Sequence, residues 1–350
     1  MMTRPEVRVG FDAHHLAQPH TGNGVHTAGL LHALRSGAAA ARIRLRAYGP
    51  SQDRELSGSR ARRVLYDYAH HARVDRLDLL HTQYTAPAWS PVPFCMTIHD
   101  AAFARPGTPD FSRARLIAWR WQARRAAAVI TVSNAARDDL VGALRLDETT
   151  VRVIPNGVTR VEPTPVESDR IAHALRTAQR PLIAYIGRLA ARKRVPLLLS
   201  AFELFRQGSG GTLVVAGATG GEARAELLAR QAEGVIRLES LTEGEKWALL
   251  DGVDAFAFLS EYEGFALPVV EAMLASVPVV VTPDPAVLEV SHGKVIVAED
   301  SPASVAEALS RAVDARDGVL VRQAVEVAAT YTWDKAARAT LALYREIAGR

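Results

Sequence analysis

The stretch LSEYEGFALPVVEAMLASVPVV, residues 259–280, carries the pattern that decides the fold. The apolar run AFAFLS that leads into it predicts a strand, the segment after Pro268 predicts an apolar helix, and VPVVVT predicts the next strand. A strand, a helix and a second strand in succession are typical of a parallel sheet, whose ligands bind where the strands end. The stretch therefore predicts an α/β fold with a ligand-binding loop before the helix.

The same alternation extends outward from this stretch in both directions. Helical patterns such as RVPLLLSAFELFRQ (194–207) and EARAELLARQA (222–232) separate short β-rich runs. The runs are VRVGFDA, IRLRAYGP, DLLHTQY, FCMTIHD, AVITVS and VRVIPNG in the first half, and LIAYIG, TLVVAG, VIRLES, AFAFLS, VPVVVT and KVIVAE in the second. Because each half repeats the pattern of parallel strands and crossover helices, we expect two doubly wound domains.

Two further segments bear on how these domains are joined. VTRVEPTPVESDR (158–170) has two prolines, several charges and no apolar periodicity, which is typical of a linker, so the boundary is expected near residue 165. In WDKAARATLALYREIAGR (333–350), Trp333, Ala337, Leu341 and Tyr344 recur at three- and four-residue steps. That spacing predicts a helix with one apolar face, which must pack against another part of the protein.

The composition agrees with two folded domains in a reducing compartment. At 350 residues and 48% hydrophobic content, the chain is long enough for two domains of ordinary size. The single cysteine, Cys95, lies in the apolar run VPFCMTI, and we expect a buried, inert thiol. The first residues lack the apolar region of a signal peptide, and no stretch reaches the roughly 18 apolar residues that a spanning helix needs. We therefore expect a cytoplasmic protein.

Positive charge is concentrated in the first half of the chain. Residues 1–165 contain 22 arginines, no lysine and 14 acidic residues, a net charge of +8, whereas the remainder carries −4. The arginines are dispersed and no recognisable nucleic-acid module accompanies them, so we expect no nucleic acid as partner and favour anionic lipid or phosphate. SRARLIAWRWQARRA (112–126) could contact an anionic membrane at its inner face, or form a solvated helix with two packed tryptophans.

The loop and helix start within 259–280 offer groups suited to a nucleotide-sugar. Gly264 allows the backbone to approach a ligand closely, and Pro268 suits an early helical position. Carboxylates such as those of Glu263 and Glu271 suit sugar and ribose hydroxyls, although two glutamates eight residues apart carry little meaning alone. The backbone amides expected to face an anion are those of Phe265, Ala266 and Leu267.

The whole string closely resembles the Glu, seven residues, Glu motif of family 4 glycosyltransferases, usually seen within EGFGLPxxEAMAxGxPV. The resemblance implies a retaining transferase in which Glu263 contacts the donor sugar and Glu271 the ribose hydroxyls of the nucleotide. Ala266 and Ser276 replace glycines of the family pattern. We expect the methyl group of Ala266 to reshape the donor pocket, and Ser276 to lie in a turn.

The resemblance also implies an architecture. It predicts the GT-B fold, with two Rossmann-like parallel-sheet domains facing a central cleft and a C-terminal helix that crosses back to the first domain. We expect an N-terminal acceptor-binding domain over residues 1–163 plus 333–350, and a C-terminal domain that binds the nucleotide-sugar donor over residues 164–332.

The segment GRLAARK (187–193) follows the strand LIAYI and precedes a helix, the geometry of a phosphate site. Arg188 offers a planar fork of donors and Lys193 a mobile point charge. The resemblance assigns both to the phosphates of the donor, with Gly187 allowing the turn. Arg192 and Arg194 are expected to be surface charges.

Two segments of the first half resemble ligand-site loops of the family. His99 closes the run FCMTIH at an expected sheet edge, where a histidine alone is more often bonded to local backbone. The resemblance places His99 beside the reacting sugar, where it hydrogen-bonds donor or acceptor. In PHTGNGVHTAGLLHAL (19–34), Gly22 and Gly24 precede an amphipathic helix and resemble the family's loop beside the donor diphosphate, although a plain glycine turn would look the same.

No metal is expected. Asp12, His14 and His15 lie together in FDAHHL, but adjacent histidines on an extended chain point to opposite faces. The sequence also has no Asp-x-Asp triplet, the pair commonly used to hold a divalent cation against a diphosphate. We therefore expect Arg188, Lys193 and backbone amides to neutralise the diphosphate without a metal or other cofactor.

The expected reaction is retaining transfer of a hexose from a GDP- or UDP-sugar, with GDP-mannose as one candidate, to a glycan, glycolipid or small molecule. No carboxylate stands out as a nucleophile, so we expect front-face attack in which the departing phosphate oxygen takes the acceptor proton. Four alternatives stay open: a nucleotide-sugar epimerase, a glycan phosphorylase, a non-catalytic nucleotide-sugar-binding protein and a basic membrane-surface scaffold.

Overall fold

The computed structural model describes residues 6–105, 111–218, 233–316 and 318–349. The chain forms two compact units: unit 1 comprises Met1–Gly157 and Tyr331–Arg350, and unit 2 comprises Val158–Thr330. The chain divides at 157/158 and 330/331, whereas the divisions expected from the sequence were at 163/164 and 332/333. The helix expected over 222–232 lies outside the described residues.

Unit 1 is built on a six-stranded parallel sheet in the order β2-β1-β3-β4-β5-β6. The chain order reverses between β1 and β3, and ligands of such sheets bind where the strands on either side of that point end. All six strands coincide with the β-rich runs of the first half. They are β1 (Val7–Asp12), β2 (Ile43–Tyr48), β3 (Leu79–Gln83), β4 (Phe94–Thr97), β5 (Ala128–Thr131) and β6 (Val151–Val153).

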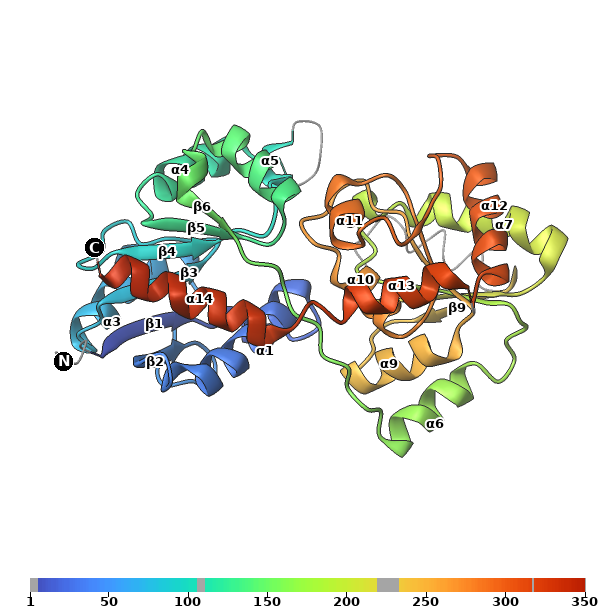
Figure 1. Cartoon of the computed structure of the whole chain (residues 1–350), viewed down its shortest axis with the longest axis horizontal. Helices are drawn as coiled ribbons and strands as arrows, with labels where there is room; N and C mark the ends of the chain where they lie inside the picture. Colours follow the sequence, from blue (N-terminus) through green and yellow to red (C-terminus); the bar gives the residue numbers. More distant parts are fainter. Residues whose placement is uncertain (1–5, 106–110, 219–232, 317, 350) are drawn as a thin grey trace. The chain divides into compact units, whose positions relative to one another are not determined.

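Helices cover both faces of this sheet. On one face α1 (Gly22–Ala38) packs against α14 (Trp333–Ala348) (Figure 1). Phe11, Leu34 and Tyr344 share a core there. On the other face α3 (Tyr68–Val74), α4 (Arg113–Ala123) and α5 (Asn134–Leu144) bury Trp119 and Leu140. The terminal helix thus returns to the first unit, as expected. The short helices of the unit are η1 (His14–Ala17), α2 (Arg60–Arg62), η2 (Arg63–Asp67), η3 (Ala102–Ala104) and η4 (Glu148–Thr150).

Unit 2 has a second six-stranded parallel sheet, in the order β12-β11-β10-β7-β8-β9. Its strands are β7 (Leu182–Ile186), β8 (Thr212–Ala216), β9 (Val235–Leu238), β10 (Ala255–Phe258), β11 (Val279–Val281) and β12 (Ile296–Val297). Its described helices are α6 (Pro165–Ala174), η5 (Ala191–Lys193), α7 (Val195–Ser209), α9 (Glu243–Gly252), α10 (Leu267–Leu274), α11 (Pro285–Val290), α12 (Pro302–Asp314) and α13 (Val319–Ala328). The helices pack in pairs, α7 with α12, α10 with α13, and α6 with α9.

Two expectations from the sequence have clear outcomes. Residues 158–170 are not a linker throughout, because α6 begins at Pro165. A capping box starts this helix: the Thr164 side chain accepts from the Glu167 amide and the Glu167 carboxylate accepts from the Thr164 amide. Cys95 is a buried free thiol, as expected, and burial raises its pKa.

Candidate active site

The two loops singled out by the sequence lie side by side in unit 2. β7 and β10 are neighbours in the sheet, with Phe256 opposite Ala184. Because the strands are parallel, the loop after β7 and the loop after β10 leave the sheet at the same edge. The backbone N–H of Glu261 donates to the carbonyl of Arg192 at 2.8 Å, which joins the two loops directly.

Glu263 is held by two cations of the first loop. Its Oε1 accepts from Lys193 Nζ and from Arg192 Nη1, the latter at 2.9 Å. Arg192 also donates to the carbonyl of Tyr262 at 2.7 Å, and the Lys193 ammonium lies 4.5 Å from the centre of the Phe258 ring. Burial alone would raise the pKa of Glu263, but the charges of Lys193 and Arg192 outweigh it and lower that pKa. The carboxylate is therefore ionised at neutral pH.

The expectation that Arg192 is a surface charge is wrong. The one-turn helix η5 curls residues 191–193, and the carboxylate of Glu263 attracts both cations of this turn to the sheet edge. Arg194 lies outside this cluster and pairs with Glu261 and Asp300, each at 2.9 Å. Arg192 and Arg194 are about equally exposed, so the members of this basic run differ in their partners: Arg192 and Lys193 pair with the buried Glu263, and Arg194 pairs with Glu261 and Asp300.

Arg188 is exposed, unlike Lys193. Tyr185 Oη donates to the Arg188 carbonyl at 3.1 Å, so the phenol lies directly beneath this loop. A Cβ on Gly187 would lie 2.9 Å from the Tyr185 hydroxyl oxygen. A Cβ on Gly217, where φ is +132°, would overlap the Gly187 carbonyl. The glycines let the two loops meet closely, and Arg188 is exposed beside them, where an anion can reach it.

The helix start at α10 has an unusual backbone. Ala266 precedes Leu267, the first residue of α10, and is left-handed with φ +60° and ψ +61°. This conformation is costly for a residue with a Cβ, which accounts for the glycine that the family pattern has at this position. Ala266 and its neighbours Phe265 and Leu267 are buried, as is Gly264. The amides expected to face an anion therefore lie in a closely packed loop at the sheet edge.

Glu271 has a partner that sequence reasoning missed. Its Oε1 accepts from Lys246 Nζ of α9 at 2.6 Å, and both residues are buried. Lys246 also contacts Glu243 Oε2 at 2.8 Å. Burial raises the pKa of Glu271, whereas the carboxylates of Glu271 and Glu243 outweigh burial and raise the pKa of Lys246, so the ammonium stays charged. A lysine inside EGEKWALL carries no motif that would have predicted it.

Asp284 is a second residue that the sequence did not indicate. It follows β11, the neighbour of β10, and caps α11 by accepting from the Val287 amide at 2.9 Å. Its other oxygen accepts from the Glu263 amide at 3.1 Å, which fixes the backbone of the Glu263 loop. Burial, together with the negative charge of Glu263, raises the pKa of Asp284 to about 6.

Gly22 and Gly24 were expected before the helix, but they lie inside the first turn of α1. The side chain of Thr21 caps the helix by accepting from the Gly24 amide at 3.1 Å. A Cβ on Gly24 would overlap the carbonyl oxygen of Gln18, whereas nothing lies within 4 Å of a Cβ built on Gly22. Gly24 is therefore required by packing, and Gly22 leaves open space at the helix start.

His99 lies at the carboxyl edge of the unit 1 sheet in contact with two aromatic rings. Its ring centre is 4.3 Å from that of His26 and 5.5 Å from that of Tyr84. His26 Nδ1 is 2.8 Å from Asn156 Oδ1, so its Nδ1–H donates to that oxygen. Burial lowers the pKa of His99 well below its usual value and that of His26 to about 4, so both rings are neutral at pH 7.

Several buried polar atoms at this edge have no hydrogen-bond partner within the described part of the chain. They include His99 Nε2, His26 Nε2, both ring nitrogens of His15, both side-chain amide atoms of Gln83, and Thr131 Oγ1. An unpaired buried polar group costs about 1–3 kcal/mol, so such groups are expected to bind a ligand or water. The set contains donors and acceptors, which suits a ligand rich in hydroxyl groups.

The adjacent His14 and His15 were expected on extended chain, and this expectation is wrong. Residues His14–Ala17 form the short helix η1, and the rings of His14 and His15 are 4.0 Å apart. Asp12 ends β1 and accepts from His14 Nδ1 at 2.8 Å and from Tyr68 Oη at 2.7 Å. Its carboxylate therefore organises this edge through hydrogen bonds. Within the described residues, no group of three or more histidine, cysteine or acidic side chains is placed to hold a metal ion.

Two family models match the chain, one for each unit. The model described as "Glycosyltransferase Family 4" matches residues 13–160, and the model described as "Glycosyl transferases group 1" matches residues 168–326. The second match contains both loops of the unit 2 site.

Individual proteins agree with these matches. A GDP-mannose:cellobiosyl-diphosphopolyprenol alpha-mannosyltransferase from Komagataeibacter xylinus is 32% identical over 51% of this chain and 48% of its own length. The chain spans about half the length of the curated relatives it matches. Among solved structures, sucrose-phosphate synthase from Thermosynechococcus elongatus superposes with a TM-score of 0.78 at 17% identity, covering 97% of this chain and 98% of that one.

A second solved structure carries a ligand. HepE from Anabaena, in complex with UDP-glucose, superposes with a TM-score of 0.73 at 17% identity, covering 96% of this chain and 99% of that one. At this identity both structural likenesses show the fold alone, which is the GT-B fold. The two parallel sheets, the loops at their edges and the two family models together establish that the chain belongs to the group 1, family 4 glycosyltransferases.

Proposed function

We propose that this chain transfers a hexose, with retention of configuration, from a GDP- or UDP-sugar to a glycan or glycolipid acceptor. The observation that carries the proposal is the contact between Glu263 and the two cations Lys193 and Arg192, on loops that leave adjacent strands of one sheet. Fixed positive charge beside a carboxylate suits a diphosphate attached to a sugar, because the cations bind the phosphates and the carboxylate accepts from hydroxyls.

Unit 2 supplies the groups proposed for the donor. Arg188, which is exposed, is assigned to the phosphates together with Lys193 and the loop of Gly187. Lys193 is paired with Glu263, so donor binding would divide the charge of this lysine between the carboxylate and a phosphate. Glu271 is assigned to the ribose hydroxyls. The amides of Gly264, Phe265, Ala266 and Leu267 are assigned to the sugar and diphosphate.

Unit 1 supplies the groups proposed for the acceptor. The neutral ring of His99 can both donate and accept, and the unpaired atoms of Gln83 and His15 lie at the same sheet edge. These groups fit sugar hydroxyls better than an anion, because none of them carries a charge at pH 7. Gly22 and Gly24 keep their assignment to the donor diphosphate as part of the proposal.

The proposed reaction breaks the bond between the sugar C1 and the phosphate oxygen and forms the bond between C1 and the acceptor oxygen on the same face. The acceptor proton passes to the departing phosphate oxygen, so the diphosphate leaves singly protonated. The protein contributes orientation, fixed positive charge from Arg188 and Lys193, and exclusion of water.

The first experiment identifies the nucleotide and tests the donor site. We expect one of UDP, GDP or ADP to raise the unfolding midpoint of the protein, because a ligand that binds only the folded state stabilises it. Glu271→Ala should reduce this shift, while Glu263→Ala should retain it and lose transfer. Arg176→Ala, which changes an exposed arginine outside these loops, serves as control. If no nucleotide stabilises the protein, or Glu271→Ala and Arg176→Ala behave alike, the assignment is wrong.

The second experiment identifies the reaction class. With the preferred nucleotide-sugar and an acceptor panel, anomeric analysis of the product should show the configuration of the donor. An epimerised nucleotide-sugar, or sugar 1-phosphate formed from a glycan and phosphate, would instead assign the site to one of the other two enzyme classes. Binding without any turnover would make the chain a nucleotide-sugar-binding protein.

A further inference from the structure

Unit 1 exposes large apolar side chains in three short segments. Leu65 and Tyr66 of η2 are 72% and 54% exposed, Trp89 is 50% exposed, and Ile117 and Trp121 of α4 are 66% and 50% exposed. Single exposed apolar residues are ordinary on a protein surface, but several close together indicate a contact surface. The sequence left open whether both tryptophans of 112–126 are packed. Trp119 is buried, and Trp121 is not.

Specific contacts place the three segments next to one another. The Ala88 amide donates to the Val64 carbonyl at 2.8 Å, which joins the loop of Trp89 to η2. Arg125 Nη1 donates to the Ala88 carbonyl at 2.8 Å, which joins the same loop to the end of α4. The Arg60 guanidinium lies 5.9 Å from the centre of the Trp119 ring, so α2 also borders α4. Residues 60–66, 86–92 and 113–125 therefore form one region, termed here the arginine–tryptophan surface.

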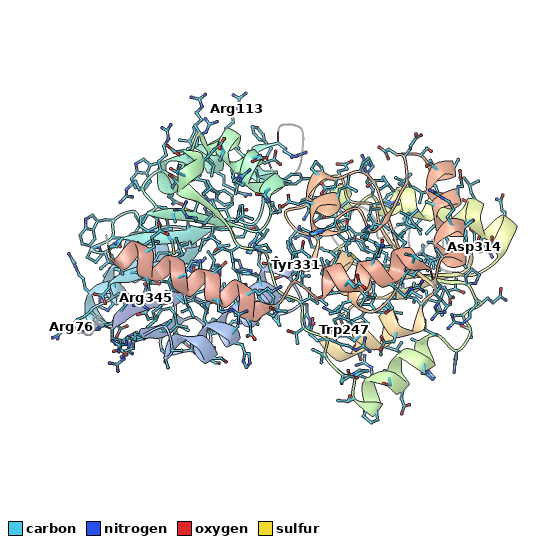
Figure 2. The ribbon with its side chains drawn as sticks, in the orientation of Figure 1. Arg76, Arg113, Trp247, Asp314, Tyr331 and Arg345 are labelled. Atoms are coloured by element: carbon cyan, nitrogen blue, oxygen red, sulfur yellow. The ribbon has the colours of Figure 1, made fainter. Side chains whose placement is uncertain are left out.

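The outward face of α4 shows how charge and apolar groups are combined. Ile117 and Trp121 are one turn apart and so lie on the same side of the helix. Arg113 and Arg124 are exposed at either end of this stripe, and Figure 2 shows Arg113 at the outer end of the helix. The Arg125 guanidinium lies 4.2 Å from the centre of the Trp121 ring. The exposed apolar side chains are thus bordered by guanidinium groups.

The charge of this surface has one sign only. Residues 60–66, 86–92 and 113–125 contain eight arginines and no acidic residue. The nearest carboxylate along the chain, Asp67, is buried and bonded to Arg62 Nε at 3.3 Å and to the Ser57 amide at 3.0 Å. An occupant must therefore accept apolar side chains and provide negative charge across a broad area.

We propose that the arginine–tryptophan surface docks on the face of an anionic phospholipid bilayer. Trp121, Ile117 and Trp89 enter the interfacial region, where the apolar part of an indole ring is buried and its N–H remains near water. The arginines pair with lipid phosphates while their apolar stems lie along the membrane surface. Such docking is peripheral, since no helix among the described residues is long and apolar enough to cross a bilayer. The inference does not depend on the identity of the sugar donor.

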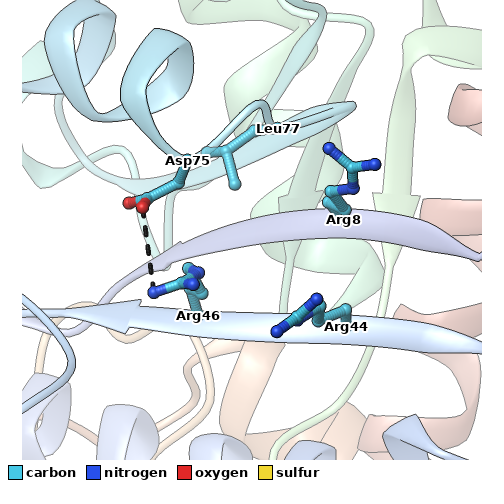
Figure 3. A pocket seen from close by; sticks show the side chains of 5 residues that line it. All are labelled: Arg8, Arg44, Arg46, Asp75 and Leu77. Carbon is cyan, nitrogen blue, oxygen red and sulfur yellow. Dashed lines mark ion pairs between the residues drawn. The ribbon is translucent and has the colours of Figure 1, made fainter.

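A second basic feature of unit 1 lacks the apolar component. Arg8 of β1 and Arg44 and Arg46 of β2 line a small pocket of about 70 Å³ with Asp75 and Leu77 (Figure 3). Arg46 Nη1 lies 3.7 Å from Asp75 Oδ1. This pocket carries positive charge without an exposed large apolar side chain, because Leu77 is buried. Arg44, which is exposed, therefore gives a control for charge alone.

The test is binding of the whole chain to vesicles of phosphatidylcholine with and without phosphatidylglycerol. We expect binding to the mixed vesicles that weakens as salt is raised, and little binding to phosphatidylcholine alone. The double substitution Ile117→Ser with Trp121→Ser should weaken binding about tenfold or more, because both side chains lose apolar burial. Arg113→Gln and Arg124→Gln should each weaken it about fivefold.

Matched controls separate this surface from general effects. Val166→Ser in unit 2 removes an apolar side chain of similar exposure, 69% against 66% for Ile117, and should leave binding unchanged. Arg44→Gln should also leave it unchanged. Each variant is checked for stabilisation by the preferred nucleotide, or for its unfolding midpoint alone if no nucleotide binds. A loss of vesicle binding is then distinguished from a loss of fold and from failure of the proposed enzymatic function.

Three results would overturn the proposal. The first is no binding to mixed vesicles at low salt. The second is an equal loss in Arg44→Gln and Arg113→Gln, which would show that the net charge of the unit acts without a defined surface. The third is a molecular mass that rises with protein concentration and falls in the Ile117→Ser, Trp121→Ser variant, which would identify a second copy of the chain as the occupant.

Discussion

Lys246 Nζ lies 2.6 Å from Glu271 Oε1, and this buried pair ties α9 to α10 at the helix that follows the Glu263 loop. The ammonium is shared with the half-exposed Glu243 at 2.8 Å. Lys246 neutralises Glu271 and, with it, fixes the position of the carboxylate proposed for ribose. The lysine is a positioning residue in this arrangement.

Lys246→Met should destabilise the protein by about 3 kcal/mol, because it leaves Glu271 buried without its cation. Lys246→Met combined with Glu271→Gln should cost less than the sum of the two single changes, since the double variant leaves neither member of this pair as a buried charge without its partner. Chemical denaturation of the four proteins measures this coupling. Additive costs would mean that the pair does not interact in solution. Nucleotide affinity should fall in both single variants, a readout that packing loss alone would not change.

Ser276 adopts φ +60° in the turn after α10, at a position where the family pattern has glycine. Ser276→Gly should raise the free energy of unfolding by up to about 1 kcal/mol, because glycine adopts this backbone without steric cost. Ala275→Gly is the control. Ala275 has φ −78°, so the same added freedom of the unfolded chain should destabilise the protein. Equal effects of the two substitutions would refute the explanation by backbone strain.

Unit 1 should lose stability on mild acidification. The pKa values of His15 and His26 are lowered to about 4 and that of His81 to about 3, in each case chiefly by burial. The unfolded chain protonates these residues near pH 6.5, so between pH 6.5 and 4 the unfolded state binds more protons than the folded state. The stabilising contribution is complete above pH 6.5 and is lost as the pH falls.

Calorimetry between pH 7.5 and 4.5 measures this effect. Nine of the eleven histidines lie in residues 1–157, so the transition assigned to unit 1 should shift further than that of unit 2. His26→Asn should reduce the shift, and His173→Asn, which changes an exposed residue of unit 2, should not. Parallel shifts of both transitions would contradict the assignment to the buried histidines.

Tyr344 Oη lies 2.5 Å from His81 Nδ1 in the core between α14 and the unit 1 sheet. Tyr344→Phe should cost about 1–3 kcal/mol, because His81 Nδ1 then stays buried without a partner. Leu343→Ala, which shortens a buried apolar side chain of the same helix, provides a comparison that leaves this hydrogen bond in place. Equal free energies of unfolding for Tyr344→Phe and the unchanged protein would contradict this.

Asp284→Asn should become progressively less destabilising, relative to the unchanged protein, as the pH rises from 4 to 7. The pKa of Asp284 is raised from 3.8 to about 6 by burial and by Glu263, so between these pH values the folded state keeps a proton that the unfolded chain releases, and the stability of the unchanged protein falls as the pH rises from about 4 to 6. The gain should be about 2 kcal/mol between these limits, allowing for partial screening by solvent. Denaturation at pH 4, 5, 6 and 7 follows it, and a difference between the two proteins that does not vary with pH would exclude this role.

The sheet architecture could be predicted because the spacing of apolar residues and the lengths of the segments between the β-rich runs are sufficient to indicate it. All twelve strands in the described part of the chain fall within β-rich runs read from the sequence, and the spacing of Trp333, Leu341 and Tyr344 predicted the buried face of α14. Boundaries were less accurate. Residues 158–170 lack apolar periodicity, yet α6 starts within them, because capping by Thr164 and Glu167 acts locally and independently of that period.

Partners across the sheet edge could not be predicted from residue types. Lys193 and Glu263 were identified through motifs, but their direct contact depends on β7 and β10 being neighbours. Arg192 and Lys246 have no motif of their own, so only the folded chain shows them beside a glutamate. Similarly, His15 was expected on extended chain, and the helix η1 turns its ring onto that of His14.

The packing of α14 against α1 also determines the order in which the chain can fold. Trp333, Leu341 and Tyr344 complete the core that contains Phe11 and Leu34. Residues 1–157 of unit 1 therefore cannot complete this core until α14, more than 170 residues further along the chain, has been synthesised. Unit 2 is continuous in sequence and can form in the interval. During synthesis, unit 1, which carries the greater positive charge, is therefore the last to complete its core.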